Sequence, residues 1–152
     1  MRIAFLAPAA LLLGTAPALA TASLSCSADD KSLRFSAEGI VSHGVGEGVA
    51  QFTGELEVRL KEAPPGLRKL PLGLEHLTQR WLHGREVKLR LFREREGEGQ
   101  GSVELVVETR QATKDETEFS GSYVLTVSSE EAAQGAPART LKARGRASCS
   151  FG

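Results

Sequence analysis

Cys26 and Cys149 are the only two cysteines in this chain of 152 residues, and each stands between serines in an alternating segment. Disulfides persist in exported proteins, whose surroundings are oxidising. We expect these thiols to form one, which requires Cα atoms about 4.4–6.8 Å apart. The bond would join the first and last strands of the domain. Lipid attachment at Cys26 is the alternative, but it would leave Cys149 as an unpaired thiol.

His43, His76 and His83 are the only histidines, and imidazole is a common zinc ligand. His76 and His83 are seven residues apart, close to two helical turns, so both rings would lie on one face of a helix. With His43 from a glycine-rich loop, they are weak candidates for a three-histidine zinc site. Because the spacing matches no established ligand motif, we expect surface histidines, no metal and no cofactor.

Basic residues gather in two parts of the chain. The first covers residues 80–95, and the glutamate-bearing segments predicted beside it would neutralise it through cross-strand ion pairs. The second part comprises Lys142, Arg144 and Arg146 in the last segment. Opposite it we expect Arg34 and Ser36 rather than carboxylates. Because unpaired cations attract anionic partners, this second part is the candidate binding surface, with a solvated strand edge as the alternative.

No motif in the chain indicates catalysis. The glycine-rich segments 44–48 and 97–101 are not followed by Lys-Ser or Lys-Thr, so neither is a phosphate-binding loop. A Gly-x-Ser-x-Gly nucleophile motif is missing as well. The glutamates alternate outward in predicted strands, which does not favour a buried carboxylate pair. We therefore expect a protein that is not an enzyme, with a hydrolase or a metal-binding protein as less favoured alternatives.

Residues 1–20 have the three parts of an export signal: Arg2, an apolar run over 3–13, and a small-residue site at Ala18-Leu19-Ala20. The apolar run is shorter than the roughly 20 residues that span a bilayer. We expect cleavage after Ala20, which leaves residues 21–152 as a single domain without a transmembrane segment. The alanine-, glycine- and arginine-rich composition favours a bacterial protein, periplasmic or secreted.

The overall charge is balanced, with 19 acidic and 19 basic residues before Arg2 is removed with the signal. Such a balance does not favour a nucleic acid or an anionic membrane as partner. Apolar residues make up 41% of the chain and charged residues 25%, which is typical of a folded globular domain rather than a disordered one.

Apolar and polar residues alternate with a period of two along most of the exported part, as in Val87, Leu89 and Leu91 with Lys88 and Arg90 between them. This pattern predicts strands with one buried and one exposed face. We expect strands at about 23–28, 32–42, 50–61, 85–95, 102–110, 118–128 and 139–151. A turn at residues 29–31 would reset the register after the first strand, and the glycine-rich segments would form hairpin connections.

Residues 62–84 interrupt the alternation. Pro64-Pro65-Gly66 excludes a continuing strand. Leu74, Leu77 and Trp81 follow at i, i+3 and i+7, with Gly84 in a position typical of a helix end. This spacing predicts one short helix over an open end of the β-structure, with an irregular crossover as the alternative.

The predicted fold is all-β: a small antiparallel meander barrel or curled sandwich of 6–8 strands, with one short capping helix and a disulfide between the terminal strands. The first functional hypothesis is an exported, inhibitor-like or protein-interaction module that binds an envelope protein through its basic surface. The second is a carrier of a small ligand in a barrel cavity, motivated by the small residues Ala143, Gly145 and Ala147.

Overall fold

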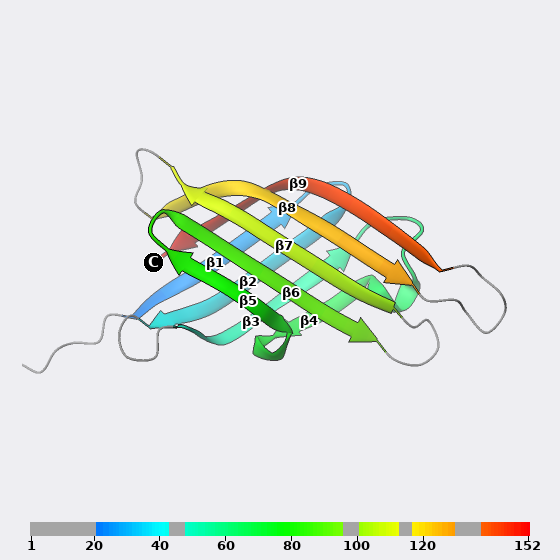
Figure 1. Ribbon diagram of the computed structural model, residues 1–152, viewed down its shortest axis with the longest axis horizontal. Helices are drawn as coiled ribbons and strands as arrows, with labels where there is room; N and C mark the ends of the chain where they lie inside the picture. The colour runs from blue at the N-terminus through cyan, green and yellow to red at the C-terminus, as the bar shows by residue number, and fades with distance from the viewer. Residues whose placement is uncertain (1–20, 43–47, 96–100, 113–116, 130–137) are drawn as a thin grey trace, which may run out of the picture.

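The computed structural model describes residues 21–42, 48–95, 101–112, 117–129 and 138–152, and these form an antiparallel β-barrel that is nearly closed (Figure 1). Nine strands lie within the described residues. They are β1 (Thr21–Asp29), β2 (Leu33–Ser42), β3 (Gly48–Val58), β4 (Lys69–Gly73), β5 (Leu77–His83), β6 (Glu86–Arg95), β7 (Gly101–Gln111), β8 (Glu118–Ser129) and β9 (Arg139–Phe151). Two short 3₁₀ turns, η1 (Pro65–Leu67) and η2 (Leu74–His76), flank β4.

The strands follow one another around the barrel, in the order β4-β3-β2-β1-β9-β8-β7-β6-β5. Strands that pair with each other are therefore consecutive in sequence, except where β1 pairs with β9 and joins the two ends of the chain. In Figure 1, β9 (red) starts at the right-hand end and runs back to the carboxyl terminus, beside β8. The two outer strands of this order, β4 and β5, do not pair with each other, which leaves the barrel open along one side.

Side chains fill the interior because the alternation in the sequence turns every second residue inward. On β7, for example, Val103, Leu105 and Val107 are buried, while Glu104 between them and Glu108 after them reach the outer face. Tyr123 and Phe35 are the largest fully buried side chains among the described residues. The predicted meander of alternating strands is thus confirmed, with nine strands in place of six to eight.

The predicted capping helix is wrong, because its residues form η2 and the edge strand β5. Leu77 is buried, but Leu74 and Trp81 are 44% and 53% exposed, so the three residues do not share an apolar helical face. Gly84 has a positive φ of 60° and stands in the tight turn between β5 and β6. The backbone pairing of β5 with β6 outweighs the helical spacing of these residues, which arises by chance.

Strand β4 was not predicted; it lies in the stretch 62–84 where the alternation is interrupted, and Pro71 stands at its centre. Proline is compatible with a strand at the edge of a sheet, where no neighbour needs its missing N–H. Leu70 and Leu72 on either side of it are buried. From β6, the guanidinium of Arg93 donates to the carbonyl of Pro71, and that of Arg95 donates to the carbonyl of Gly66 (2.9 Å). Side chains thus bridge the side of the barrel that no ladder closes.

A bulge in β3 shifts the register of its buried residues. Between the pairs Ile40↔Ala50 and Glu38↔Thr53, one extra residue lies on β3, and Gln51 there has a positive φ of 50°. As a result Val49 and Phe52 are both buried although they differ in parity. Alternation within β3 alone could not reveal that shift.

The turn predicted at residues 29–31 lies between β1 and β2, and Asp30 organises it. Its Oδ1 accepts hydrogen bonds from the N–H groups of Ser32 (2.7 Å) and Leu33 (3.2 Å). The glycine-rich connections predicted at 44–48 and 97–101 lie outside the described residues, apart from Gly48 and Gly101. The strands that they join do pair antiparallel. Within the described part of the chain, no helix is long and apolar enough to cross a membrane.

Candidate functional site: a basic strand on the barrel surface

The three basic residues singled out by the sequence lie on the outer face of β9. Lys142, Arg144 and Arg146 are all exposed, while the residues between them turn toward the interior. We call these three residues the basic row. Since β9 pairs with β8 without a register break, the three side chains lie in a line along the barrel surface.

No carboxylate neutralises the basic row within the described part of the chain. Its partners on β8 are Thr126, Val124 and Ser122, which carry no charge. The expectation that Arg34 and Ser36 lie opposite is wrong, because both are on β2, and β1 separates β2 from β9. The ion pairs found among the described residues involve other cations.

The acidic residue closest along β1 is already engaged elsewhere. Asp29 Oδ1 accepts a hydrogen bond from Arg59 Nη1 (2.7 Å), and its Oδ2 lies 3.8 Å from Arg34 Nε. Arg59 also donates to the carbonyl of Asp30 (2.7 Å). The carboxylate of Asp29 therefore pairs with Arg34 and Arg59 and does not neutralise the basic row.

The other basic stretch differs from the basic row because most of its cations have partners. Arg90 donates to Glu104 Oε2 across the β6–β7 ladder, at 2.9 Å from Nε, and Lys88 Nζ lies 3.1 Å from Glu86 Oε2. Arg93 and Arg95 bind the backbone carbonyls described above. The predicted neutralisation of residues 80–95 by ion pairs is thus confirmed in part, with carbonyl oxygens in place of some carboxylates.

On the inner face, β9 leaves room for a polar contact at Gly145. The hydroxyl of Tyr123 on β8 donates to Asp30 Oδ2 (2.6 Å), and this bond passes directly over Gly145. A Cβ atom at residue 145 would lie 2.5 Å from Tyr123 Cε1 and would overlap the Asp30 carboxylate. The small residue that suggested space for a guest in fact allows close packing.

The protonation states of this contact follow from its surroundings. Partial burial by itself raises the pKa of Asp30, but hydrogen bonds from Tyr123, Ser32 and Leu33 and the charge of Arg59 together hold that pKa below its ordinary value. Burial first, and then the hydrogen bond to Asp30, raise the pKa of Tyr123. The carboxylate is thus ionised and the phenol is a donor at neutral pH.

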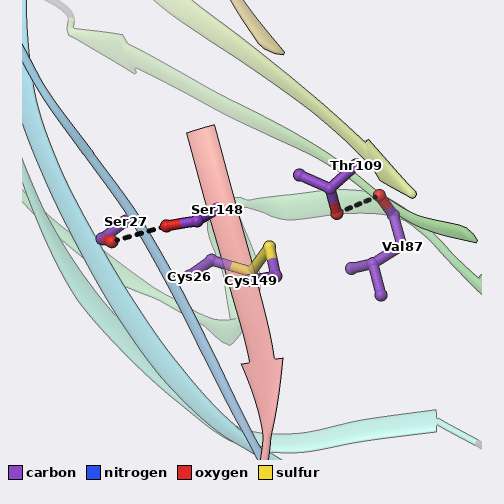
Figure 2. The surroundings of a disulfide bond; sticks show 6 residues. All are labelled: Cys26, Ser27, Val87, Thr109, Ser148 and Cys149. Atoms are coloured by element: carbon purple, nitrogen blue, oxygen red, sulfur yellow. Dashed lines mark hydrogen bonds between the residues drawn. A yellow bond between two sulfur atoms is a disulfide. The ribbon is translucent and has the colours of Figure 1, made fainter. Parts of the chain in front are cut away.

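The disulfide lies at the carboxyl-terminal end of β9, where β1 begins to pair with it. Cys26 and Cys149 face each other with Cα atoms 4.0 Å apart, slightly closer than the range expected, and their sulfurs are bonded. Figure 2 shows the sulfurs on the side of Thr109 and Val87, whereas the hydrogen-bonded hydroxyls of Ser27 and Ser148 (3.3 Å) lie on the other side. The predicted bond between terminal strands is confirmed.

The histidines do not come together in the way that a helix would have allowed. His76 precedes β5 and His83 ends it, so the extended strand sets them about 20 Å apart. The Nδ1 atom of His76 accepts a hydrogen bond from the N–H of Gly73 (2.9 Å). His83 packs edge-to-face against Trp81, with ring centroids 5.8 Å apart. His43 lies outside the described residues.

A pocket of about 590 Å³ opens where the start of β3 lies near β5 without pairing with it. Its lining includes Trp81 and the edge-to-face rings of Phe119 and Phe151, whose centroids are 5.3 Å apart. The guanidinium of Arg80 lies beside Gly48 at this pocket, and no described carboxylate pairs with it. This site was not predicted from the sequence, although the single tryptophan of the chain was a signal for it.

Glu86 also lines that pocket, but its carboxylate is paired with other cations. Arg110 Nη2 donates to Glu86 Oε1 (2.7 Å), and Lys88 Nζ lies close to Glu86 Oε2. Hydrogen bonds from Arg110 and Lys88 lower the pKa of Glu86. Its negative charge is therefore balanced locally, and Arg80 is the charged residue at the pocket for which the described residues offer no partner.

No protein-family model, curated protein or solved structure matches this chain.

Proposed function

We propose that this protein is an exported, non-catalytic binding module that captures an anionic envelope partner on the basic row of β9. The observation that carries the proposal is the set of three exposed cations in line, without a carboxylate partner among the described residues. Export is supported by the signal-like sequence of residues 1–20 and by the disulfide between the terminal strands.

The contrast between charges on the same molecule supports this use of β9. Arg59 and Arg90 form close contacts with acidic neighbours and so contribute to the fold. The basic row forms no such contact with the described residues, and its charges contribute repulsion along one strand. An anionic partner would remove this repulsion, and the attraction would act over about one Debye length, roughly 8 Å at physiological salt.

The test is partner capture by a variant with reversed charges, Arg144→Glu/Arg146→Glu. Purified protein is immobilised and exposed to an envelope extract of its own host, and the captured proteins are identified by mass spectrometry. The double variant should lose a partner that the wild-type protein retains, and raising the salt concentration should release the same partner.

The matched control is Lys61→Glu/Lys69→Glu, which changes the net charge equally on exposed residues near β4. In the sheet order, β4 is four places away from β9. This control should keep the partner. Equal capture by the wild-type protein and both variants would refute the proposed function of the basic row.

A second candidate function is carriage of a small ligand, and the pocket beside Trp81 favours it. A half-exposed indole and a guanidinium that pairs with no described carboxylate suit a small molecule with an apolar body and a carboxylate. Because Trp81 is the single tryptophan, its fluorescence reports directly on this pocket. Titration with dodecanoate should shift the emission of the wild-type protein but not that of Arg80→Ala, and an unchanged spectrum in both would argue against this site.

A further inference from the structure

Strand β9 is paired along its whole length on one side only. Its ladder with β8 runs from Arg139 to Ser150, whereas its ladder with β1 covers only Ser148–Phe151. Strand β1 ends at Asp29, where the chain turns into β2. The part of β9 before Ser148 therefore has an edge that no other described strand covers.

The hydrogen-bonding pattern tells which backbone groups face this open edge. Ser23 and Gly152 exchange two hydrogen bonds of 2.9 Å, so the N–H and C=O groups of Gly152 point toward β1. Successive residues of a strand point their backbone groups to opposite sides. The N–H of Phe151 accordingly donates to the opposite side, to the carbonyl of Thr117 (3.0 Å).

The same alternation continues to the start of β9, because its pairing with β8 has no register shift. The backbone groups of Thr140, Lys142 and Arg144 therefore point to the open edge, where no described strand reaches them. Two of these residues also carry the outward-facing cations of the basic row. Backbone groups and charges that have no partner among the described residues thus coincide at the same positions.

The inner face of this edge is apolar. Leu141 and Ala143 point toward the barrel and are only partly buried, and both pack against the hydrophobic core. An added strand would place alternate residues beside these two side chains and the others beside Lys142 and Arg144. The edge therefore suits a strand in which acidic and small apolar residues alternate.

We propose that the open edge of β9 binds an extended acidic segment of the partner as an additional antiparallel strand. The inference rests on the proposed function and specifies how the basic row would be used. Backbone hydrogen bonds to Lys142 and Arg144 hold the segment, and its carboxylates face the cations on the outer surface. Apolar residues of the segment cover Leu141 and Ala143.

A second copy of this chain does not fit the same edge. Antiparallel pairing of two β9 edges would bring two basic rows against each other, and like charges on neighbouring strands destabilise the pair. Lysine and arginine at an edge discourage self-association for this reason. The same charges stabilise an acidic strand, so the edge selects its partner by charge.

The experiment separates backbone pairing from charge attraction by comparing Lys142→Ala with Lys142→Pro. Both variants lose the same cation, but only proline removes the N–H at the open edge. This N–H makes no bond to β8, so proline leaves that ladder intact. The probe is a fluorescent synthetic peptide in which glutamate alternates with valine, measured by anisotropy. Lys142→Ala should weaken binding a few-fold, and Lys142→Pro by about tenfold more.

A second measurement applies to the unmodified protein and does not depend on the folding of the proline variant. Amide hydrogen exchange at Lys142 and Arg144 should slow by at least about tenfold when the peptide saturates the protein. Exchange at Thr53, on the exposed face of β3, should not change. A peptide of the same composition with its glutamates in one block should bind more weakly, because its residues cannot alternate between the two faces.

Three results would overturn the inference: no saturable binding of the alternating peptide, equal affinities of Lys142→Ala and Lys142→Pro, or unchanged exchange at both amides. Any of them, together with a partner that is lost specifically by Arg144→Glu/Arg146→Glu, would leave the proposed function standing without strand addition. If Arg144→Glu/Arg146→Glu captured the same proteins as the wild-type protein, the proposed function itself would be refuted.

Discussion

At the scale of single residues, the contact between Tyr123 and Asp30 connects distant parts of the chain. The phenol belongs to β8 and the carboxylate to the turn between β1 and β2, 93 positions apart in sequence. Gly145 makes their approach possible because it has no Cβ atom. Tyr123, Asp30 and Gly145 match no sequence motif, yet together they hold the turn against the inner face of β9.

Removal of this contact should make the protein less stable and change its response to acid. Because the pKa of Asp30 is lowered from 3.8, the unfolded chain takes up a proton more readily than the folded one. The stabilisation is therefore present above about pH 4 and is lost as the pH falls through the lowered pKa. Tyr123→Phe should reduce the free energy of unfolding by about 1–3 kcal/mol at neutral pH, measured by urea denaturation.

The control for this prediction is Ser120→Ala on the exposed face of β8, which should leave the unfolding curve unchanged at every pH. Repeating the denaturation between pH 2 and 7 should show that Tyr123→Phe approaches the wild-type stability in acid. A constant difference over that range would show that the charge of Asp30 is not involved.

At the scale of elements, β4 and β5 show how a barrel can be completed without a closed ladder. Both are edge strands, and they are joined by η2 rather than paired. Side chains from β6 reach across to the β4 region, where Arg93 and Arg95 donate to backbone carbonyls. These contacts hold the short strand in place at the open side, where it covers part of the core with Leu70 and Leu72.

Arg93→Ala should therefore loosen β4 while the rest of the barrel stays folded. We expect faster amide exchange within Lys69–Gly73 and a loss of about 1 kcal/mol in the free energy of unfolding. The matched variant Arg90→Ala removes an arginine from the same strand that pairs with Glu104 instead. If both variants changed the amide exchange of β4 equally, the hydrogen bond from Arg93 to Pro71 would not be the contact that holds β4 in place.

At the scale of the whole molecule, the disulfide and the β1–β9 ladder join the two ends of a meander. The bond links positions 123 residues apart, so it removes much conformational freedom from the unfolded chain. For a loop of that length the chain-entropy relation gives about 4–5 kcal/mol. Typical domains have a net stability of about 5–15 kcal/mol, so this one bond is a large share of it.

Cys26→Ser/Cys149→Ser should accordingly lower the melting temperature by about 10–15 °C. Calorimetry measures it, and reduction of the wild-type protein should reproduce the shift. Adding reductant to the serine variant should have no effect, which controls for unspecific action of the reductant. A melting temperature that does not respond to reduction would mean that the β1–β9 ladder alone closes the barrel.

Much of this architecture follows from local patterns in the sequence. The alternation of Val87, Leu89 and Leu91 predicts β6, and similar runs predict six further strands, because a strand buries every second residue. Cysteines in the first and last of these runs, behind a signal-like sequence, predict the disulfide, which the structure contains. The exposed basic row could be recognised as well, since its cations alternate with small residues.

Other features depended on which strands became neighbours, and no local pattern contains that information. Strand β4 follows Pro64-Pro65-Gly66, which interrupt the alternation, and a chance helical spacing indicated a helix in place of β5. Edge pairing outweighed both local signals. Ser122, Val124 and Thr126 face the basic row only because β8 pairs with all of β9, and its open edge exists only because β1 ends early. Composition and periodicity thus determined seven of the nine described strands and the disulfide. Tertiary pairing decided which charges have no partner among the described residues, since pairing joins residues far apart in the chain.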